Sequence, residues 1–565
     1  MRNLLLIPLL LTLIFLSIKD RSKKNLIWLF IVLNIAAILT NLTGITKDIS
    51  KGYSVILFIF LLLLSIKNRR VKLDYWSLFP IILVWGTGIF SAFFPLSKLL
   101  YGLTQGYDNE GHIPLLWRTY STGGFLWSPL VGSDGFSTWA NVSNSYPLQN
   151  AGFASLLFRI SGVVISGTDE LVRAYFFVTA TTFIMLALLI AYTFIKGGSN
   201  KNKKMVGILI FTGIFAGAPS ALFWGGFPPT VWGILIVACY FSLDPTKMKT
   251  FESWILLLLS SVVINYSYQL FAPALMVVAG YKFIENFRNR NFKLSFSFLV
   301  IPPISIILAL PIFLHSKIVS SYIFHFGGIL VPHRLSVLLV IYCCLVIFKV
   351  AQRKIELDAQ IFSFLAITAV AEFSLAIATI DAKGVYYPAK ILYFAIILGL
   401  FTLPKILTGK AQLKNIQALK QKSRTRNARK ISSVLIASCF LAVSVFDAFF
   451  GRGFNNSWMG SSIQNIPSMV LAQNKNCIAE IYHSVSTRNL ELSKQTFFAV
   501  ETDGKLNDFQ SRWANALRGN MGDKIYDFSI SGSGNTFTSV YPTWHLKYPD
   551  DSLVLVTMRK PGECK

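Results

Sequence analysis

The run Val-Ile-Leu-Phe-Ile-Phe-Leu-Leu-Leu-Leu-Ser-Ile occupies residues 55–66 and carries no charge. Similar apolar blocks contain Ile306–Leu314 and Ile391–Leu403. Each block extends to roughly 15–20 residues, near the length of helix that crosses the hydrocarbon layer of a bilayer. Of the 565 residues, 53% are hydrophobic and 14% are charged, and the mean hydropathy is +0.55. So few charges could not cover the surface of a soluble chain of this length. The sequence therefore predicts a polytopic α-helical membrane protein.

The formal net charge of +27 is distributed unevenly along the chain. Residues 451–565 contain 12 Lys or Arg against 10 acids, so this segment carries only +2 and the remaining +25 lies before it. There the cations cluster between apolar blocks, and residues 405–430 hold nine Lys or Arg and no acid. Membrane proteins concentrate Lys and Arg in cytoplasmic loops. The charge therefore indicates membrane topology, and we expect no nucleic-acid partner.

The basic clusters and the apolar blocks together predict a topology. We expect 13–14 transmembrane helices in residues 1–450, because the basic clusters alternate with the apolar blocks. Residues 3–18 could form a signal-peptide core, but the basic stretch 19–24 lacks a small-residue cleavage site, so we expect a retained helix. A large loop at 97–170, the segments 316–334 and 380–387, and everything after about 450 fall on the outer side of a plasma membrane. The expected helices lie near 3–18, 25–45, 53–67, 75–96, 171–195, 205–223, 229–243, 252–269, 271–285, 295–315, 335–350, 361–379, 388–408 and 431–449.

Residues 451–565 are predicted to form a small α/β domain outside the membrane. Phe497–Glu501 and Ser552–Met558 have the apolar and β-branched composition of strands, and Asp508–Leu517 resembles a short helix. About 110 residues suffice for a small core. Cys477 and Cys564 flank this region and could form a disulfide in an oxidising compartment, although two free thiols would also fit the sequence.

The polar motif Tyr107–Asp108–Asn109–Glu110–Gly111–His112 opens the predicted outer loop. A partly buried carboxylate can act as a general base toward a hydroxyl group, which would make Asp108, Glu110 and His112 catalytic candidates. Alternatively, Asp108 and Glu110 could bind a divalent cation such as Mg, Mn or Ca, because carboxylate oxygens suit these ions. A third interpretation is structural, with the two acids capping the helix that follows.

Several cations lie at the predicted outer boundary and could bind a lipid phosphate. Arg173 begins one helix, His333 and Arg334 precede another, and Lys390 ends the segment Tyr386–Tyr387–Pro388–Ala389–Lys390. Lys390 stands on the outer side, against the positive-inside trend, and its alternatives are snorkelling or pairing with Asp381. Glu372 lies inside an otherwise apolar helix. An acid at such a position is either a functional residue or forms a hydrogen bond between helices.

These features resemble the GT-C superfamily of integral membrane glycosyltransferases, and in particular actinobacterial cell-envelope arabinosyl- and mannosyltransferases. The resemblance covers residues 1–450 loosely and rests on three motifs, namely Tyr107–His112, Tyr146–Pro147 and Tyr386–Lys390. It implies that Asp108 deprotonates the acceptor hydroxyl and that Glu110 and His112 orient the acceptor or bind a metal. It also implies that Arg173, His333, Arg334, Tyr387 and Lys390 bind the donor phosphate. The chain differs from many members in placing the acidic motif after about four helices.

The resemblance implies transfer of a sugar from a polyprenyl-phosphate donor to a glycan, lipid or protein acceptor of the cell envelope, among the membrane lipids. No glycine-rich phosphate loop follows a strand, which favours a lipid-linked donor over a nucleotide sugar. A transporter, flippase or polymerase of lipid-linked glycans is the alternative, and a scaffolding protein is a third. A transporter usually has internal repeats and helices broken at the bilayer midplane, and the sequence shows no clear repeat.

Overall fold

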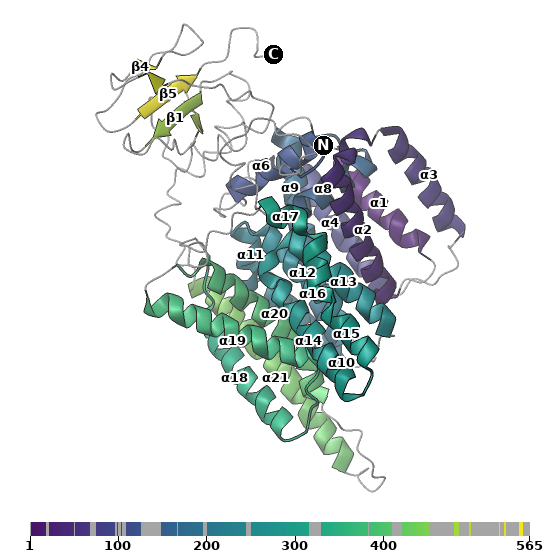
Figure 1. Ribbon diagram of the computed structural model, residues 1–565, viewed down its shortest axis with the longest axis vertical. Helices are drawn as coiled ribbons and strands as arrows, with labels where there is room; N and C mark the ends of the chain where they lie inside the picture. The colour runs from purple at the N-terminus through teal and green to yellow at the C-terminus, as the bar shows by residue number, and fades with distance from the viewer. Residues whose placement is uncertain are drawn as a thin grey trace.

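The computed structural model describes a bundle of α-helices (Figure 1). Helices α1–α4 lie along one side, α18–α21 lie along the other, and α9–α16 lie between them. The described residues are 2–18, 22–49, 51–67, 75–96, 99, 103, 109–125, 148–165, 168–195, 201–243, 250–315, 329–381, 384–408, 421–450, 480–484, 496–498, 530–531, 536–537 and 553–557.

Every range in which the sequence predicts a transmembrane helix contains a helix in the structure. The helices of the first half are α1 (Leu6–Ser17), α2 (Lys23–Thr43), α3 (Lys51–Lys67), α4 (Tyr75–Phe93), α6 (Asn109–Thr122), α8 (Gln149–Ser161), α9 (Thr168–Ile195), α10 (Lys201–Phe215), α11 (Ala221–Trp224) and α12 (Pro228–Ser242). Those of the second half are α13 (Thr250–Ser267), α14 (Ala272–Arg288), α15 (Phe292–Leu299), α16 (Ile301–Leu308), α17 (Leu310–His315), α18 (His333–Ala351), α19 (Ala359–Ile380), α20 (Tyr386–Thr408) and α21 (Gln421–Phe450). Short 3₁₀ turns occur at Arg2–Leu5, Ile45–Asp48, Ala218–Ser220 and Gln269–Phe271.

Seven of the described helices are long and apolar enough to cross a membrane, as a polytopic helical membrane protein requires. The count becomes eight if α10 and the helical segment Ala218–Trp224, which meet at a bend of 45°, form one span. Six further apolar helices of the described chain are shorter. The predicted helix at 205–223 is therefore broken, and that at 295–315 consists of the three pieces α15, α16 and α17.

The predicted loop at 97–170 contains two helices, α6 and α8, that the hydropathy pattern did not indicate. They pack against each other, and α8 also packs against α2. Asn41 of α2 donates a hydrogen bond from Nδ2 to the carbonyl of Gly152 (3.0 Å), and the amide of Phe125 donates to the carbonyl of Asn41 (2.9 Å). This segment is therefore part of the packed bundle where it is described.

The apolar side chains form two separate buried cores. One core takes side chains from α1, α3, α4, α6, α8 and the first half of α9, including Phe158 and Phe177. The other takes them from α2, the second half of α9 and most helices from α10 to α21. Helix α12 is buried along its whole length, which explains why its sequence is apolar on every face. Many side chains of α3, by contrast, are exposed and apolar, as expected for a face in contact with lipid.

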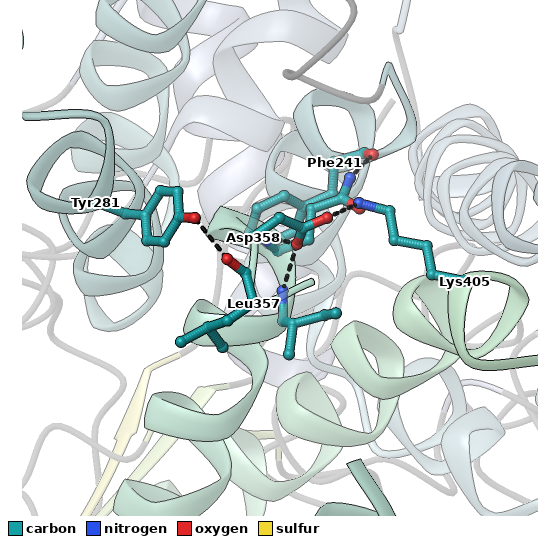
Figure 2. A network of polar contacts seen from close by, with 7 residues as sticks. Phe241, Tyr281, Leu357, Asp358 and Lys405 are labelled. Carbon is teal, nitrogen blue, oxygen red and sulfur yellow. Dashed lines mark hydrogen bonds and ion pairs between the residues drawn. The ribbon is translucent and has the colours of Figure 1, made fainter. Parts of the chain in front are cut away.

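The basic ends of several helices meet at one end of the bundle, which we call the basic end. Asp358 caps α19 by accepting hydrogen bonds from the amides of Gln360 and Ile361, each 3.0 Å long, and pairs with Lys405 of α20 (Figure 2). Such a cap contributes about 1 kcal/mol. The same network joins α12 and α14, through the carbonyl of Phe241 and the hydroxyl of Tyr281.

Helix α2 begins at the basic end as well. Lys24 pairs with Glu252 of α13 (2.6 Å), and Lys23 donates a hydrogen bond to the carbonyl of Ser242, the last residue of α12. Lys349 near the end of α18 donates to the carbonyl of Ile406 in α20 (3.1 Å). The contacts thus bring together helix ends that the charge pattern assigns to one side.

The described part of the C-terminal region consists of strands. They are β1 (Glu480–Ser484), β2 (Thr496–Phe498), β3 (Ile530–Ser531), β4 (Thr536–Phe537) and β5 (Leu553–Thr557). In one sheet, β1 pairs antiparallel with both β2 and β5, which places Ile481 opposite Phe497 and Val556. In a second sheet, β3 pairs antiparallel with β4. Strand β5 lies within the predicted strand Ser552–Met558, and β2 overlaps the predicted strand Phe497–Glu501 at its first two residues. The predicted helix at 508–517 lies outside the described residues.

Candidate functional site

The start of α6 carries the described part of the acidic motif and is anchored through Asn109. This side chain is buried, and its Nδ2 donates a hydrogen bond to the carbonyl of Leu103 (2.8 Å). Its Oδ1 accepts one from the hydroxyl of Tyr175 on α9 (2.5 Å). Because both polar atoms of the amide are engaged, the motif is held at a defined place beside α9.

Gly226 allows the start of α6 to approach the turn between α11 and α12. Its φ of +81° lies in the left-handed region that favours glycine. A Cβ at this position would lie 2.6 Å from the amide nitrogen of Asn109 and 2.7 Å from its Cγ. No other residue type fits this contact without displacing α6. The next residue, Phe227, consequently lies beside the acidic motif.

Lys390 lies one turn into α20 and is buried within a set of aromatic rings, which we call the Lys390 cage. Its exposed fraction is 1%. The ammonium lies 3.8 Å from the ring centroid of Tyr386, 4.4 Å from that of Phe227, and 5.5 Å from those of Tyr268 and Tyr387. These distances fall within the range of cation–π attraction, which offsets part of the cost of burying the charge. The cage joins α20 with the segments that precede α12 and α14.

His112 belongs to the same constellation. Its side chain is buried in α6, outside the candidate membrane spans. Burial, with a smaller contribution from the ammonium of Lys390, lowers the pKa of His112 to about 3. The imidazole is therefore neutral near pH 7, so that it can orient a hydroxyl or coordinate a metal and does not act as a phosphate-binding cation. The described part of the first motif, Asn109–His112, and the second motif, Tyr386–Lys390, therefore meet here.

The lowered pKa of His112 predicts a pH dependence of stability. An unfolded chain takes up this proton below about pH 6.5, whereas the folded protein does so only near pH 3. Folding stability should therefore fall as the pH drops below 6.5, by at most about 1.4 kcal/mol per pH unit from this group. His112→Gln should remove that part of the slope, measured as the melting temperature of the detergent-solubilised protein between pH 7 and pH 5.

The control for this measurement is His333→Gln, because His333 is exposed at the start of α18. It should leave the difference between pH 7 and pH 5 as in the wild type. If His112→Gln also retained the full pH slope, the buried neutral state of His112 would be contradicted.

The remaining predicted cations lie elsewhere in the described structure. Arg173 is buried on α9, and its guanidinium donates hydrogen bonds to the carbonyls of Ser91 (2.8 Å), Ala92 (3.2 Å) and Phe94 (2.8 Å). These carbonyls belong to the C-terminal end of α4, where a cation is electrostatically favoured. Arg173 therefore anchors α4 to α9, two residues before the site residue Tyr175.

Arg334 is half-exposed and pairs with the buried Asp447 of α21 (3.2 Å), and its guanidinium lies 4.3 Å from the ring centroid of Phe446. Asp447 also accepts a hydrogen bond from the amide of Leu335 (2.9 Å), so it caps α18. Glu372 accepts a hydrogen bond from the hydroxyl of Ser336 (2.8 Å), the internal bond that was one of its two interpretations. Donor binding by Arg173, His333 and Arg334 stays a prediction.

Four predicted residues lie wholly or partly outside the described structure. Asp108, Cys477 and Cys564 are outside it, and of Glu110 only the backbone in α6 is described. Within the described residues, no group of three or more His, Cys, Asp or Glu side chains could hold a metal ion. The predicted disulfide and the predicted divalent-cation ligands Asp108 and Glu110 therefore remain predictions.

The sequence alone indicated no role for Asn109, Tyr175, Gly226, Phe227 or Tyr268. One local signal was present, because Gly225 and Gly226 precede Phe227 and two prolines at the predicted outer end of a helix. Glycine pairs mark tight turns and close backbone contacts. Tyr175 and Tyr268 carry no such signal, since an aromatic residue in an apolar helix is most often a packing residue.

Comparison of the chain with protein-family models, with curated proteins and with solved structures finds no match.

Proposed function

We propose that this protein is a GT-C-like membrane glycosyltransferase that transfers a sugar from a polyprenyl-phosphate donor to a cell-envelope acceptor. The observation that carries the proposal is the meeting of Asn109–His112, the described part of the acidic motif, with the Lys390 cage. Gly226 packs against Asn109, and the adjoining Phe227 has its ring centroid 4.4 Å from the ammonium of Lys390, although Asn109 and Lys390 are 281 positions apart in the chain. A neutral hydrogen-bonding group beside a buried cation matches the needs of a reaction at a phosphate-linked carbon.

The reaction step assigns one role to each group. The carboxylate of Asp108 accepts the proton of the acceptor hydroxyl, whose oxygen then forms a bond to the anomeric carbon of the donor sugar. The bond from that carbon to the phosphate oxygen breaks, and the electron pair leaves on the phosphate. Lys390 stabilises the negative charge that develops there, as a preorganised cation in a site of low dielectric. His112 orients the acceptor hydroxyl.

The aromatic rings of the cage suit a substrate that has both a sugar and a charged group. Tyr386 and Tyr387 meet edge to face, with ring centroids 5.0 Å apart, and Phe227 meets Tyr386 in the same way at 5.6 Å. Rings of this kind can stack on the apolar faces of sugars, and tyrosine adds a hydroxyl for hydrogen bonding. Among the predicted donor-binding residues, Lys390 and Tyr387 therefore have the strongest support.

We also propose how the protein is oriented in the membrane and how many times it crosses it. The basic end faces the cytoplasm by the positive-inside rule, so the Lys390 cage lies toward the outer face. The six shorter apolar helices and the bent pair would join the seven longer ones, which gives the fourteen spans that the sequence predicts. A lipid-linked donor then enters from the bilayer, and an α/β domain after residue 450 stands outside the membrane.

The deciding experiment is transfer by the purified protein in lipid nanodiscs. The donors are polyprenyl-phosphate arabinose, mannose, glucose and galactose, and the acceptors are cell-envelope glycan and lipid fractions. We expect one donor to lose its sugar in an acceptor-dependent manner. A parallel reaction with EDTA tests the divalent cation at Asp108 and Glu110. Sugar-lipid movement across the membrane of proteoliposomes without transfer would contradict the proposal and favour a flippase.

A further inference from the structure

A cavity of about 800 Å³ lies along the seam between the two apolar cores. Phe177 and Leu157 of one core and Ile27 and Leu235 of the other contribute to its walls. The helices on its two sides pack mainly with other partners, since α1 contacts α3 and α4 whereas α2 contacts α8 and α13. The cavity is partly open to the surface of the bundle, because Phe79 and Ile208 of its lining are exposed, and an open apolar site of this size suits an apolar ligand.

The lining of the cavity indicates a hydrocarbon chain. It consists almost entirely of aliphatic and aromatic side chains, and its few hydroxyl groups belong to Thr12, Thr181, Thr182 and Tyr192. The hydroxyl of Thr181 has no hydrogen-bond partner among the described residues. A wall of this kind offers little to a polar ligand, whereas a flexible apolar chain gains the hydrophobic free energy of each methylene that it buries.

One end of the cavity is cationic. Lys23 lines it, and this residue is the first of α2, whose N-terminal amides add a partial positive charge. Lys23 donates a hydrogen bond to the carbonyl of Ser242, and its ammonium lies 5.9 Å from the ring centroid of Tyr192. An apolar cavity with a lysine and a helix N-terminus at one end is complementary to a lipid that has an apolar acyl chain and an anionic head group.

This end is far from the proposed reaction site. Lys23 contacts the last residue of α12, whereas Phe227 of the Lys390 cage immediately precedes the first. Fifteen helical residues separate the two, which corresponds to about 22 Å along the helix axis. Lys390 does not line the cavity. A donor whose phosphate is held at Lys390 therefore has its head group at the opposite end of the bundle.

We propose that the cavity binds an acyl chain of an anionic glycerophospholipid, with the lipid phosphate at Lys23 at the basic end of α2. Basic pockets between helices on the cytoplasmic side of a membrane are suited to such head groups. The bound chain fills the seam and links the two cores. This site is independent of the proposed glycosyl transfer, because it uses none of its residues.

The test is native mass spectrometry of the purified full chain incubated with equal amounts of dioleoyl-phosphatidylglycerol and dioleoyl-phosphatidylcholine. The wild type should retain phosphatidylglycerol in preference to phosphatidylcholine. Lys23→Gln should lower the retention of phosphatidylglycerol about tenfold, as loss of a charge-assisted hydrogen bond predicts. Thr181→Phe, which fills the cavity from its wall, should abolish retention of both lipids.

Two control variants use neighbouring positions. Lys24→Gln removes a cation that pairs with Glu252 and does not line the cavity, and Ile184→Phe adds a ring on α9 outside the lining. Both should retain phosphatidylglycerol as the wild type does, and gel filtration shows that every variant is folded. Equal retention of the two lipids by the wild type, or unchanged retention by Lys23→Gln or Thr181→Phe, would overturn the site. Displacement of phosphatidylglycerol by a C55 polyprenyl phosphate in both Lys390→Met and the wild type would overturn it too, because the donor carrier would then occupy the cavity.

Discussion

Lys390→Met is expected to lower the affinity for a C55 polyprenyl phosphate by about 30-fold to 150-fold and the rate of sugar transfer by a similar factor. Methionine keeps the apolar volume of the lysine stem but removes the ammonium that holds the phosphate. A charge-assisted hydrogen bond in a desolvated site contributes roughly 2–3 kcal/mol, which corresponds to this change in affinity. Binding is measured by native mass spectrometry, so that the result does not depend on knowing the sugar.

The matched control is Lys47→Met, which removes an exposed lysine near Gly123, at the end of α2 remote from Lys23. Because exposed charges contribute little, it should leave binding and transfer unchanged. Melting temperatures separate a binding role from a structural one. If Lys390→Met melted well below the wild type but bound the lipid normally, Lys390 would be a packing residue and the donor assignment would fail.

Lys390→Arg is expected to restore only part of the function. The guanidinium keeps the charge, but it is wider and planar, and the cage places four rings within 5.5 Å of a compact ammonium. The order of donor affinity should therefore be lysine, then arginine, then methionine. This order would show that donor affinity depends on the shape of the side chain at position 390 as well as on its charge.

Asp108→Asn is expected to lower the transfer rate by roughly 10²–10⁴-fold, the usual contribution of a general base. The amide cannot accept the proton of the acceptor hydroxyl, although it is nearly isosteric with the carboxylate. Donor binding should change little, since the phosphate is held at Lys390. The measurement is a single-turnover rate in nanodiscs, with binding of the C55 polyprenyl phosphate followed in parallel.

Asp48→Asn serves as the control, because Asp48 is exposed at the end of the turn that follows α2. It should transfer sugar at the wild-type rate. If Asp108→Asn retained turnover, Asp108 would be excluded as the base, and the structural interpretation of the acidic motif would be favoured. If it lost turnover together with thermal stability, the motif would cap α6 in the manner that the sequence also allowed.

The helices could be predicted from the sequence because their signal is local. A run such as 55–66 carries enough consecutive apolar residues to specify a span, and all fourteen predicted ranges contain a helix. Helices α6 and α8 were not predicted, because their local sequences lack a long apolar run. Their residues include Arg118, Arg159 and several hydroxyl groups, so their burial depends on partners in other helices and not on their own hydropathy.

The two motifs of the site could be predicted from the sequence, but their proximity in space could not. Asp108–His112 and Tyr386–Lys390 were recognisable by their residue types, whereas Tyr175, Gly226, Phe227 and Tyr268 were not. The sequence also left three roles open for Lys390, namely snorkelling to the interface, pairing with Asp381 and binding a phosphate. The structure decides that its ammonium lies buried among rings, because that outcome depends on how α12, α13 and α20 pack.

Consecutive residues thus determined that this chain is helical, apolar enough for a membrane and basic at one set of helix ends. The tertiary structure alone decided which motifs meet, which cations pair with carbonyls or carboxylates, and where a cavity remains. The physical reason is the range of each interaction. Hydropathy and charge act on a segment whatever surrounds it, whereas close packing, as between Gly226 and Asn109, exists only when distant segments are brought into contact.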